Sequence, residues 1–404
     1  MEATAVQPMP TKRSPIIYPQ LSANEDRNGV TKGTKLLGTD GWAASNQYTS
    51  NKVENKKTGI TGGTAGEVDG TIGLPNAKGT ATKVTMTKVD IVVTASDGVG
   101  SSVYRGVVMP ASGNVTVASG IATSSGAYDV ALSSAGKVTV TPTGVAPETL
   151  TCKVLSYYDL NQVDPAQVVF TWEDKVIEAE PRRIRSTYDL DNFYGAAKTL
   201  AGQNFDLDKV LATTMAGYIN KEISCDIFDN ILDQAGECYE WDSTPAANTE
   251  WYWHQASVLG PLNLASNKIR DDIARSAGNI IIADTKLQTV FENIGGTMGG
   301  ASVPNPGMWS PQSYASQPIG PYVSGIFGGK YKVIFNQDFP TGKSCMLYKK
   351  DDLDAAYFVG VFLGLYATNP LGLDDLSVRQ GMGCQLGEVC AFPSAIKEIS
   401  VIAS

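Results

Sequence analysis

The residue types that most often carry catalysis are sparse in this chain of 404 residues. His254 is the only histidine and lies in the aromatic segment EWYWHQ, so any Ser–His–Asp or Cys–His arrangement would have to use this one imidazole. We expect a packed or interfacial side chain instead. The six cysteines lack CxxC spacing, which argues against a zinc site or a secreted disulfide framework. We expect buried free thiols at Cys152, Cys225, Cys238, Cys345, Cys384 and Cys390.

Two aspartate groups and one glycine group have the composition of a ligand site but lack its frame. The aspartates within 351–354 and the pair Asp374 and Asp375 could coordinate a hard cation, but no calcium-loop glycine pattern surrounds them, so we expect turns. The glycines within 295–300 follow a predicted helix, and no Lys-Ser/Thr comes after them, which argues against a phosphate loop. The sequence therefore predicts no catalytic residue, no cofactor, no metal and no enzymatic activity.

One charged group is better suited to contacts between proteins. Glu178 and Glu180 precede Arg182, Arg183 and Arg185 in an extended stretch. Opposite charges held close on a strand favour pairing with a neighbouring strand or subunit. The alternative is a solvated strand edge.

A second charged group is an acidic stripe. Glu222, Asp226, Asp229 and Asp233 follow one another at spacings of four, three and four. Like charges at this spacing repel unless a basic partner compensates for them. The stripe is therefore either a solvated face or one side of a contact with basic residues.

The acidic stripe lies on a predicted helix of about thirty residues, which begins near Asp206 and stops at Gly236. Such a helix would be about 45 Å long. Six apolar residues recur along it at every fourth position. Because 3.6 residues complete a turn, this row drifts by about 40° per step. The row consists of Leu211, Met215, Ile219, Ile223, Ile227 and Ile231.

The drift of this row predicts two different neighbours for the helix. We expect the first half, from Leu211 to Ile219, to pack on a sheet of its own subunit, and the later half to face another surface such as a second subunit. The alternative is burial on several sides of one large core. The residues predicted at a subunit interface are Arg182, Arg183, Arg185, Glu222, Asp226, Ile227 and Ile231.

Composition limits the class of protein. The net charge of −9 and the pI near 4.8 argue against a protein whose main task is to grip nucleic acid, because neutralising phosphates requires a basic excess. A container for nucleic acid stays open. The first residues lack the apolar run of a secretory signal, and no apolar stretch reaches the length of about eighteen residues that a membrane span needs. We expect a soluble protein made in a cytoplasm, without a membrane partner.

The chain changes character along its length. Residues 1–58 are polar and indicate an extended arm that gains order only on another surface, and residues 59–80 form a Gly-rich linker. Between 81 and 158, short Val- and Thr-rich runs alternate with turn signals, which predicts a β-sandwich or barrel. Within 159–250 we predict a basic strand, a short helix (191–203) and the long helix. Within 251–330 we predict a helix (260–278), a buried strand (279–282) and a helix that is capped by Asp284 and ends at Gly295. Residues 331–404 are predicted to form strands.

Two stretches carry a resemblance to a known family. The stretch 175–223 ends in Tyr218-Ile219-Asn220-Lys221-Glu222, and the stretch 262–294 contains LNLASNKIRDDIARSAGNIII. In order and spacing they resemble the spine-helix region and the following Gly-Asn strand of major capsid proteins from tailed phages of the T-even branch. AVQPMPTKRSPIIYPQ near the start and RQGMGCQLG near the end add weaker matches.

The resemblance implies an α+β fold of the Hong Kong 97 capsid type. It implies hexamers and pentamers that tile an icosahedral shell around packaged DNA without sequence-specific binding. Such a shell is assembled in the host cytoplasm as part of a virion, with portal, vertex and decoration proteins as further partners. The implied parts are an N-terminal arm (1–58), an E-loop that starts in 59–80, a peripheral domain with the spine helix (159–250), an axial domain (251–330) and closing strands (331–404).

Two departures from the family pattern stand out. The Val-Gln-Pro-Met segment lies almost at residue 1, so we expect a preceding scaffold-like region to be absent or already removed. Residues 81–158 have no counterpart in the family and form an inserted module, which we expect on the exterior. The alternative function is a surface-layer or adhesin-type protein that binds glycans through this module, with aromatic residues 251–253 in support and the missing export signal against it.

Overall fold

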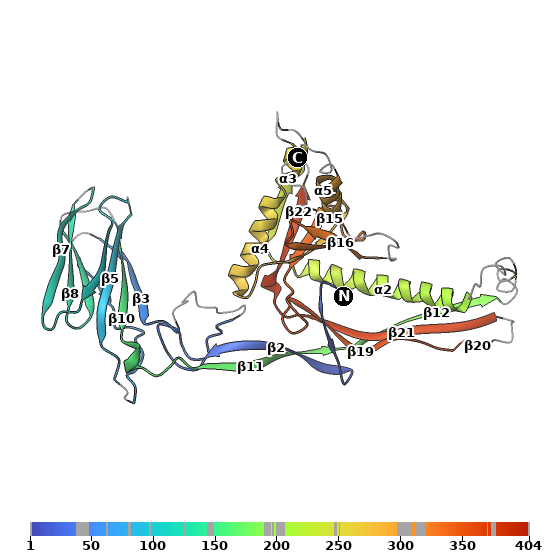
Figure 1. Cartoon of the computed structure of the whole chain (residues 1–404), viewed down its shortest axis with the longest axis horizontal. Coiled ribbons are helices and arrows are strands. Elements are labelled where there is room, and N and C mark those ends of the chain that lie inside the picture. The colour runs from blue at the N-terminus through green and yellow to red at the C-terminus, as the bar shows by residue number, and fades with distance from the viewer. Residues whose placement is uncertain are drawn as a thin grey trace. The chain divides into compact units, whose positions relative to one another are not determined.

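Alternating apolar positions become strands of five sheets in the described part of the computed structural model (Figure 1). By contacts the chain divides into two units, one made of Met1–Gln20, Leu37–Thr39 and Trp172–Ser404 and the other of Leu21–Leu36 and Asp40–Thr171. The structure describes residues 2–37, 48–61, 64–79, 82–96, 98–124, 126–143, 149–189, 195, 198, 207–245, 249, 251–296, 309–311, 320–369, 371–372 and 377–402.

The larger unit contains two sheets. The first has the order β1, β19, β21 and β12, with β20 beside β21, and the second has the order β13, β22, β18, β14, β17, β16 and β15. The strands of the first sheet are β1 (Ala5–Pro8), β12 (Glu180–Asp189), β19 (Tyr357–Ala367), β20 (Leu371–Gly372) and β21 (Ser377–Cys390). Those of the second are β13 (Cys238–Asp242), β14 (Ile280–Ala283), β15 (Trp309–Pro311), β16 (Tyr322–Phe327), β17 (Tyr331–Phe335), β18 (Lys343–Leu347) and β22 (Ile396–Ile402), which the short helix η3 (Pro393–Ala395) precedes.

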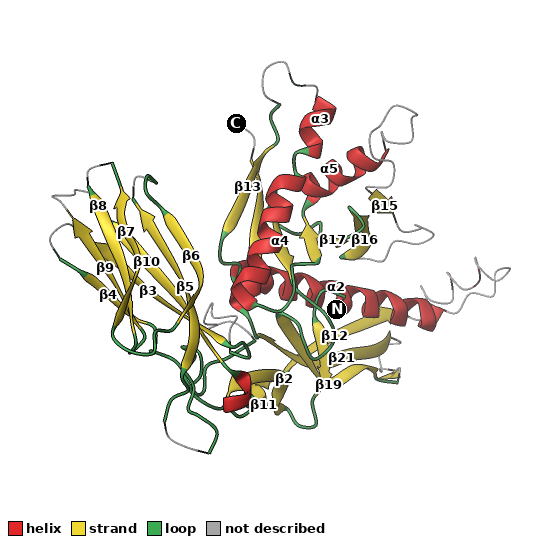
Figure 2. Cartoon of the chain, turned by 60° about the vertical axis from the view of Figure 1, so that its left-hand side comes forward, coloured by secondary structure: helices red, strands yellow, loops and turns green. Residues whose placement is uncertain are grey.

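The long helix α2 (Leu207–Asp233) lies between these two sheets (Figure 2). It contacts β12, β19 and β21 of the first sheet and β18 and β22 of the second. Its 27 residues span about 40 Å. The predicted cap at Asp206 and the predicted helix 191–203, apart from two isolated residues, lie outside the described part of the chain.

Three further helices belong to this unit: α3 (Trp251–Ala256), α4 (Leu259–Ile273) and α5 (Thr285–Gly296). Helix α4 ends earlier than predicted, because Ala274 takes a left-handed conformation with φ 51°. The chain then reaches Gly278, where a Cβ would lie 2.8 Å from the Ile269 side chain and 2.9 Å from Met346, so a larger residue would require these side chains to shift.

Asp284 caps α5 as predicted. Its carboxylate is fully buried and accepts hydrogen bonds of 3.0 Å from the backbone N–H groups of Lys286 and Leu287. It also accepts from the N–H of Gly342 at 2.6 Å and from the Ser344 hydroxyl at 3.0 Å. The cap therefore also fixes the start of β18 to the end of β14.

The N-terminal residues are part of the core, contrary to the prediction of an arm over residues 1–58. Strand β1 pairs with β19 in parallel, from Ala5 opposite Phe358 to Pro8 opposite Val361. Ala3 is fully buried. Ala5 in the strand is fully buried as well, so this segment orders on its own subunit.

The smaller unit is a sandwich of two four-stranded sheets, with the orders β3, β10, β5, β6 and β4, β9, β8, β7 (Figure 2). Alternate residues of both sheets are buried in one core, as the alternation around Val89, Ile91 and Val93 predicts. The strands are β3 (Lys52–Ile60), β4 (Gly66–Asp69), β5 (Met86–Ala95), β6 (Ser102–Val108), β7 (Asn114–Ala122), β8 (Ala127–Ser133), β9 (Lys137–Thr143) and β10 (Leu150–Tyr158), followed by the short helix η1 (Leu160–Gln162).

The sandwich begins before residue 81, which corrects the predicted start of the β-rich segment. Strands β3 and β4 lie within the ranges predicted as arm and linker, and they pair with β10 and β9. Strand β3 is an edge strand that buries only Val53 and Ile60, so it lacks the apolar alternation from which the other strands were predicted.

Strands β2 (Arg13–Ala23) and β11 (Val168–Glu178) pair with each other and connect the two units along the chain. Among the described helices, none is long and apolar enough to cross a membrane.

Candidate subunit interface

The basic strand β12 presents its arginines to two opposite sides, because side chains alternate along a strand. It is paired antiparallel with β21, with Arg182 opposite Cys384 and Arg185 opposite Gly381. Arg182 is partly covered on the side of α2, while Arg183 and Arg185 are exposed on the other side. The three arginines predicted as one group therefore form two.

Arg182 bonds within its own subunit. Its guanidinium lies 3.7 Å from a Glu222 carboxylate oxygen and forms a hydrogen-bonded ion pair with Asp226. These three residues were predicted to face another subunit. The structure gives them partners in the same chain, because the period of the strand points Arg182 at the acidic stripe of α2.

Further along the acidic stripe, Asp229 sits close to other carboxylates. Partial burial, followed by the charges of Asp226, Asp233 and Asp338, raises the pKa of Asp229. Asp338 also accepts a hydrogen bond of 3.0 Å from the Cys225 thiol. The basic residue Arg182 thus compensates for only the first part of the stripe.

The prediction that Ile227 and Ile231 face another subunit is wrong. Both are buried in the core of the larger unit, together with Met215, Ile219 and Ile223. The row does drift around the helix, but the second sheet of the same subunit covers its later half. The ring contact between Phe228 of α2 and Phe339, with centroids 6.5 Å apart, belongs to this cover.

Arg183 and Arg185 line a cavity of about 830 Å³ together with a third arginine, Arg379 of β21. Opposite Arg185, strand β21 carries Gly381, which has no side chain to fill the space. The Nε atom of Arg379 is buried without a hydrogen-bond partner among the described residues. We call this cavity the arginine pocket.

The other described residues that line the arginine pocket carry no negative charge. Tyr366 and Leu371 form an apolar rim and are 40% and 61% exposed. Neither Arg183 nor Arg185 forms an ion pair within the described part of the chain. Asp374 and Asp375, for which the sequence predicts a turn, lie outside that part. The pocket can thus receive an acidic group that has an apolar neighbour.

Arg379 was not found from the sequence. Its only signal is the pairing of β21 with β12, which places it opposite Thr187, two residues beyond Arg185 on the same face. This strand pairing joins segments that are far apart in the chain, so local sequence patterns do not predict it.

Strand β11 forms a second surface suited to association. It exposes four large apolar side chains at alternate positions: Val168, Phe170, Trp172 and Val176. The later part of its other face is packed, with Ile177 buried and the Lys175 ammonium donating to the carbonyl of Cys390 at 2.9 Å, whereas Val169 on that face is 37% exposed. The end of this strand near Ile177 is therefore held by its own subunit, while the four apolar side chains at alternate positions are largely exposed.

The residues first considered for chemistry are used structurally. His254 stacks on Trp241 with centroids 5.4 Å apart, and its Nε2 lies 2.7 Å from the carbonyl oxygen of Asp242, as expected for a packed imidazole. Asp351 accepts a hydrogen bond from the N–H of Leu353, in the turn predicted there.

The other predicted chemical groups are structural as well. Asp354 pairs with the buried Arg275 at 2.7 Å. Four cysteines are buried, as expected, while Cys238 is exposed and Cys225 is half-buried. Within the described residues no cluster of His, Cys, Asp and Glu has the geometry of a metal site.

Comparison with known proteins gives a family. Residues 2–362 match the model of the family "Major capsid protein Gp23". Comparison with curated protein sequences gives no match.

Among solved structures, the chain is similar to one from Mycobacterium phage Bobi (12% identity, 61% of this chain and 79% of that chain, TM-score 0.36). It is also similar to a virus-like particle from Pyrococcus furiosus (13% identity, 59% of this chain and 82% of that chain, TM-score 0.36). A third similar structure is the capsid of Myoviridae phage XM1 (8% identity, 60% of this chain and 81% of that chain, TM-score 0.34). At these TM-scores the structural similarities carry no weight, and the assignment rests on the family match. The chain therefore belongs to the Gp23 family of major capsid proteins.

Proposed function

We propose that the chain is the building block of an icosahedral phage shell, in which copies associate as hexamers and pentamers around packaged DNA. Family membership supports the structural role. The arginine pocket supports direct contact between copies, because three guanidinium groups meet there without a carboxylate among the described lining residues. The shell is assembled in the host cytoplasm and becomes part of the virion, with portal, vertex and decoration proteins as further partners.

The proposed architecture is of the Hong Kong 97 type. The pair β2 and β11 corresponds to the E-loop, and α2 with its sheet of β12, β19 and β21 corresponds to the peripheral domain with its spine helix. The seven-stranded sheet with α4 and α5 corresponds to the axial domain. Residues 52–158 form a module on the exterior of the shell, and an antibody against this module should bind intact particles. Failure to bind would contradict the exterior position.

The arginine pocket has the chemistry of a receptor for acidic groups. Arginine presents several N–H donors in a planar fork, which matches a carboxylate in two parallel hydrogen bonds. Holding Arg183, Arg185 and Arg379 together costs free energy through repulsion unless a negative group lies between them. The apolar rim supplied by Tyr366 and Leu371 adds surface that an incoming segment would bury.

The chain itself offers a segment of matching chemistry. The exposed face of β11 carries Asp174 and Glu178 next to Trp172 and Val176, so acidic and apolar groups alternate along it. Glu178 lies 3.3 Å from the Lys12 ammonium of the same chain, whereas Asp174 forms no ion pair within the described residues. We propose that this face of one copy docks at the arginine pocket of the next. Because pocket and strand are different surfaces, the contact is heterologous, and it builds rings when the rotation closes.

The experiment is a charge reversal. The double variant Arg183→Glu/Arg185→Glu should fold with a thermal midpoint no lower than that of the unchanged chain, because both side chains are exposed and the replacement relieves their repulsion with Arg379. Its particles, examined by electron microscopy and sedimentation, should be unassembled subunits. A matched control, Lys56→Glu/Lys57→Glu, makes the same charge change at exposed positions of β3 and should assemble normally.

Two outcomes would overturn this proposal. Intact shells from the arginine variant would remove the pocket from assembly. A wild-type chain that stays a monomer under all assembly conditions would contradict the shell function itself.

A further inference from the structure

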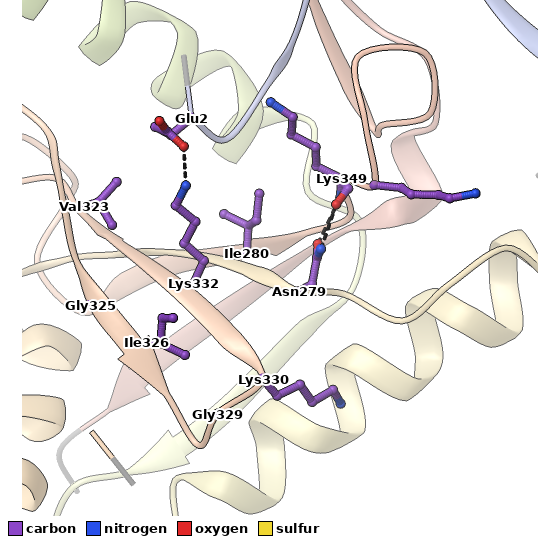
Figure 3. A pocket seen from close by; sticks show the side chains of 11 residues that line it. Glu2, Asn279, Ile280, Val323, Gly325, Ile326, Gly329, Lys330, Lys332 and Lys349 are labelled. Atoms are coloured by element: carbon purple, nitrogen blue, oxygen red, sulfur yellow. Dashed lines mark hydrogen bonds and ion pairs between the residues drawn. The ribbon is translucent and has the colours of Figure 1, made fainter. Parts of the chain in front are cut away.

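A second cationic cavity lies in the larger unit, apart from the arginine pocket. It has a volume of about 590 Å³ and is lined by Lys330, Lys332, Lys349 and Lys350, with Glu2 as the one acidic residue among its described lining (Figure 3). Four basic residues and one acidic residue line this cavity, in a chain whose net charge is −9. We call this cavity the lysine pocket.

Strand pairing explains why the four lysines border one cavity, although the Lys330 side chain points away from Lys332, toward Tyr331 (Figure 3). Lys332 lies on β17 between Ile280 of β14 and Ile326 of β16, so it rises from the middle of the sheet face. The turn from β16 to β17 contains Gly328 (φ 60°) and Gly329 (φ 66°). This tight turn places Lys330 at the rim of the cavity. Lys349 and Lys350 follow the end of β18.

Two of the four lysines already have acidic partners. Lys332 forms an ion pair with Glu2, which Figure 3 shows as a dashed line. Lys349 lies 3.6 Å from Asp352 and donates to the carbonyl of Thr4 at 2.6 Å. These two lysines hold the N-terminal segment, and the pairing lowers the pKa of Glu2.

The other two lysines have no acidic partner within the described residues. The Lys330 ammonium donates to the hydroxyl of Tyr331 at 3.0 Å, and Lys350 forms no ion pair. The acids that follow Lys350 are occupied, since Asp351 accepts from a backbone N–H and Asp354 pairs with Arg275.

We propose that the lysine pocket binds phosphate groups of a nucleic-acid backbone, a step that rests on the proposed shell function. An ammonium is a compact point charge that suits a phosphate without requiring a two-pronged geometry. No aromatic ring is among the described residues that line the cavity, so bases have nothing to stack on, and the contact is made to the backbone in any sequence. The acidic remainder of the chain keeps this contact local and weak.

The test uses the full-length chain and a short fluorescent DNA duplex, with binding followed by anisotropy as a function of salt. The variant Lys330→Gln/Lys350→Gln removes the two unpaired charges and leaves Lys332 and Lys349 to hold the N-terminus. It should lower the slope of log affinity against log salt by about 2, and weaken binding roughly tenfold or more at about 50 mM salt. The control Lys56→Gln/Lys57→Gln removes the same charge elsewhere and should change affinity far less.

Three results would overturn the inference. Equal losses in both variants would mean that total charge, not the pocket, attracts DNA. Displacement of the duplex by polyglutamate at a lower charge concentration than by inorganic tripolyphosphate would identify an acidic protein segment as the occupant. Unchanged DNA binding in the lysine variant would exclude the pocket.

Electron microscopy of the same samples tests the proposed shell function separately. Shells formed by a lysine variant that binds DNA normally would refute the lysine pocket and leave the shell function standing. Absence of shells from the wild-type chain would refute the shell function whatever the DNA result.

Discussion

Replacing Ile231 with alanine tests whether the later half of α2 belongs to its own subunit. The side chain is fully buried among the two sheets and α2. The replacement removes three carbon atoms, worth about 2.4 kcal/mol of transfer free energy. The cavity left behind adds roughly 1–2 kcal/mol. We therefore expect the free energy of unfolding of the larger unit to fall by about 3–4 kcal/mol.

The assay is chemical denaturation of the unassembled chain, with hydrogen exchange of the α2 amides to locate the loss. The control is Tyr218→Ala on the same helix, where the side chain is 55% exposed and the expected change is within about 0.5 kcal/mol. If Ile231→Ala kept its full stability and failed only in assembly, the residue would face another subunit, and the account of α2 given above would be refuted.

Two further predictions concern buried or crowded carboxylates. Asp284→Ala should lower the free energy of unfolding by about 3 kcal/mol, because it removes a helix cap and leaves buried N–H donors without an acceptor; a loss below about 1 kcal/mol in thermal unfolding would contradict this. The raised pKa of Asp229 means that the folded chain resists its ionisation, so stability falls as pH rises from about 3.9 through the folded value. Asp229→Asn should therefore raise the thermal midpoint at neutral pH, with a difference that vanishes below about pH 3.9, and a difference independent of pH would refute this.

The features that could be predicted from the sequence are those determined by residues close together along the chain. The long helix between Leu207 and Asp233 follows from uninterrupted apolar spacing and a closing glycine. The cap at Asp284 and the alternation around Ile91 are also local, and both appear in the structure. Each of these features depends on residues within a few positions of one another, so a single sequence is enough to predict it.

The features that were missed depend on contacts across the chain. Ile231 is covered by a second sheet, which is built mostly from strands later in the sequence. The four-residue spacing of the apolar row on α2 shows that this part of the helix needs a cover, but it cannot distinguish a sheet of the same subunit from another subunit. The four residues of β1 are too few to show a period, and their partner β19 begins at Tyr357. Arg379 joins the arginine pocket only through the register of β21 on β12.

The placement of cations in this acidic chain supports both proposals. Acidic residues outnumber Lys and Arg by 41 to 32, so an unpaired cation is easily neutralised by a nearby carboxylate if nothing opposes it. Yet cations gather in the arginine and lysine pockets with one acidic residue among the described linings. Lys332 and Lys349 are paired within the chain, so it is the charges of Arg183, Arg185, Lys330 and Lys350 that are best compensated from outside the subunit.

The two pockets should respond differently to salt. The apolar rim of the arginine pocket would exclude water once a segment covers it, and ion pairs shielded from solvent are screened little. Phosphates on the lysine pocket would exchange with counterions, so their binding falls steeply as salt rises. Rising salt should therefore release DNA before it dissociates the shell, and loss of both at the same ionic strength would contradict the separation of the two sites.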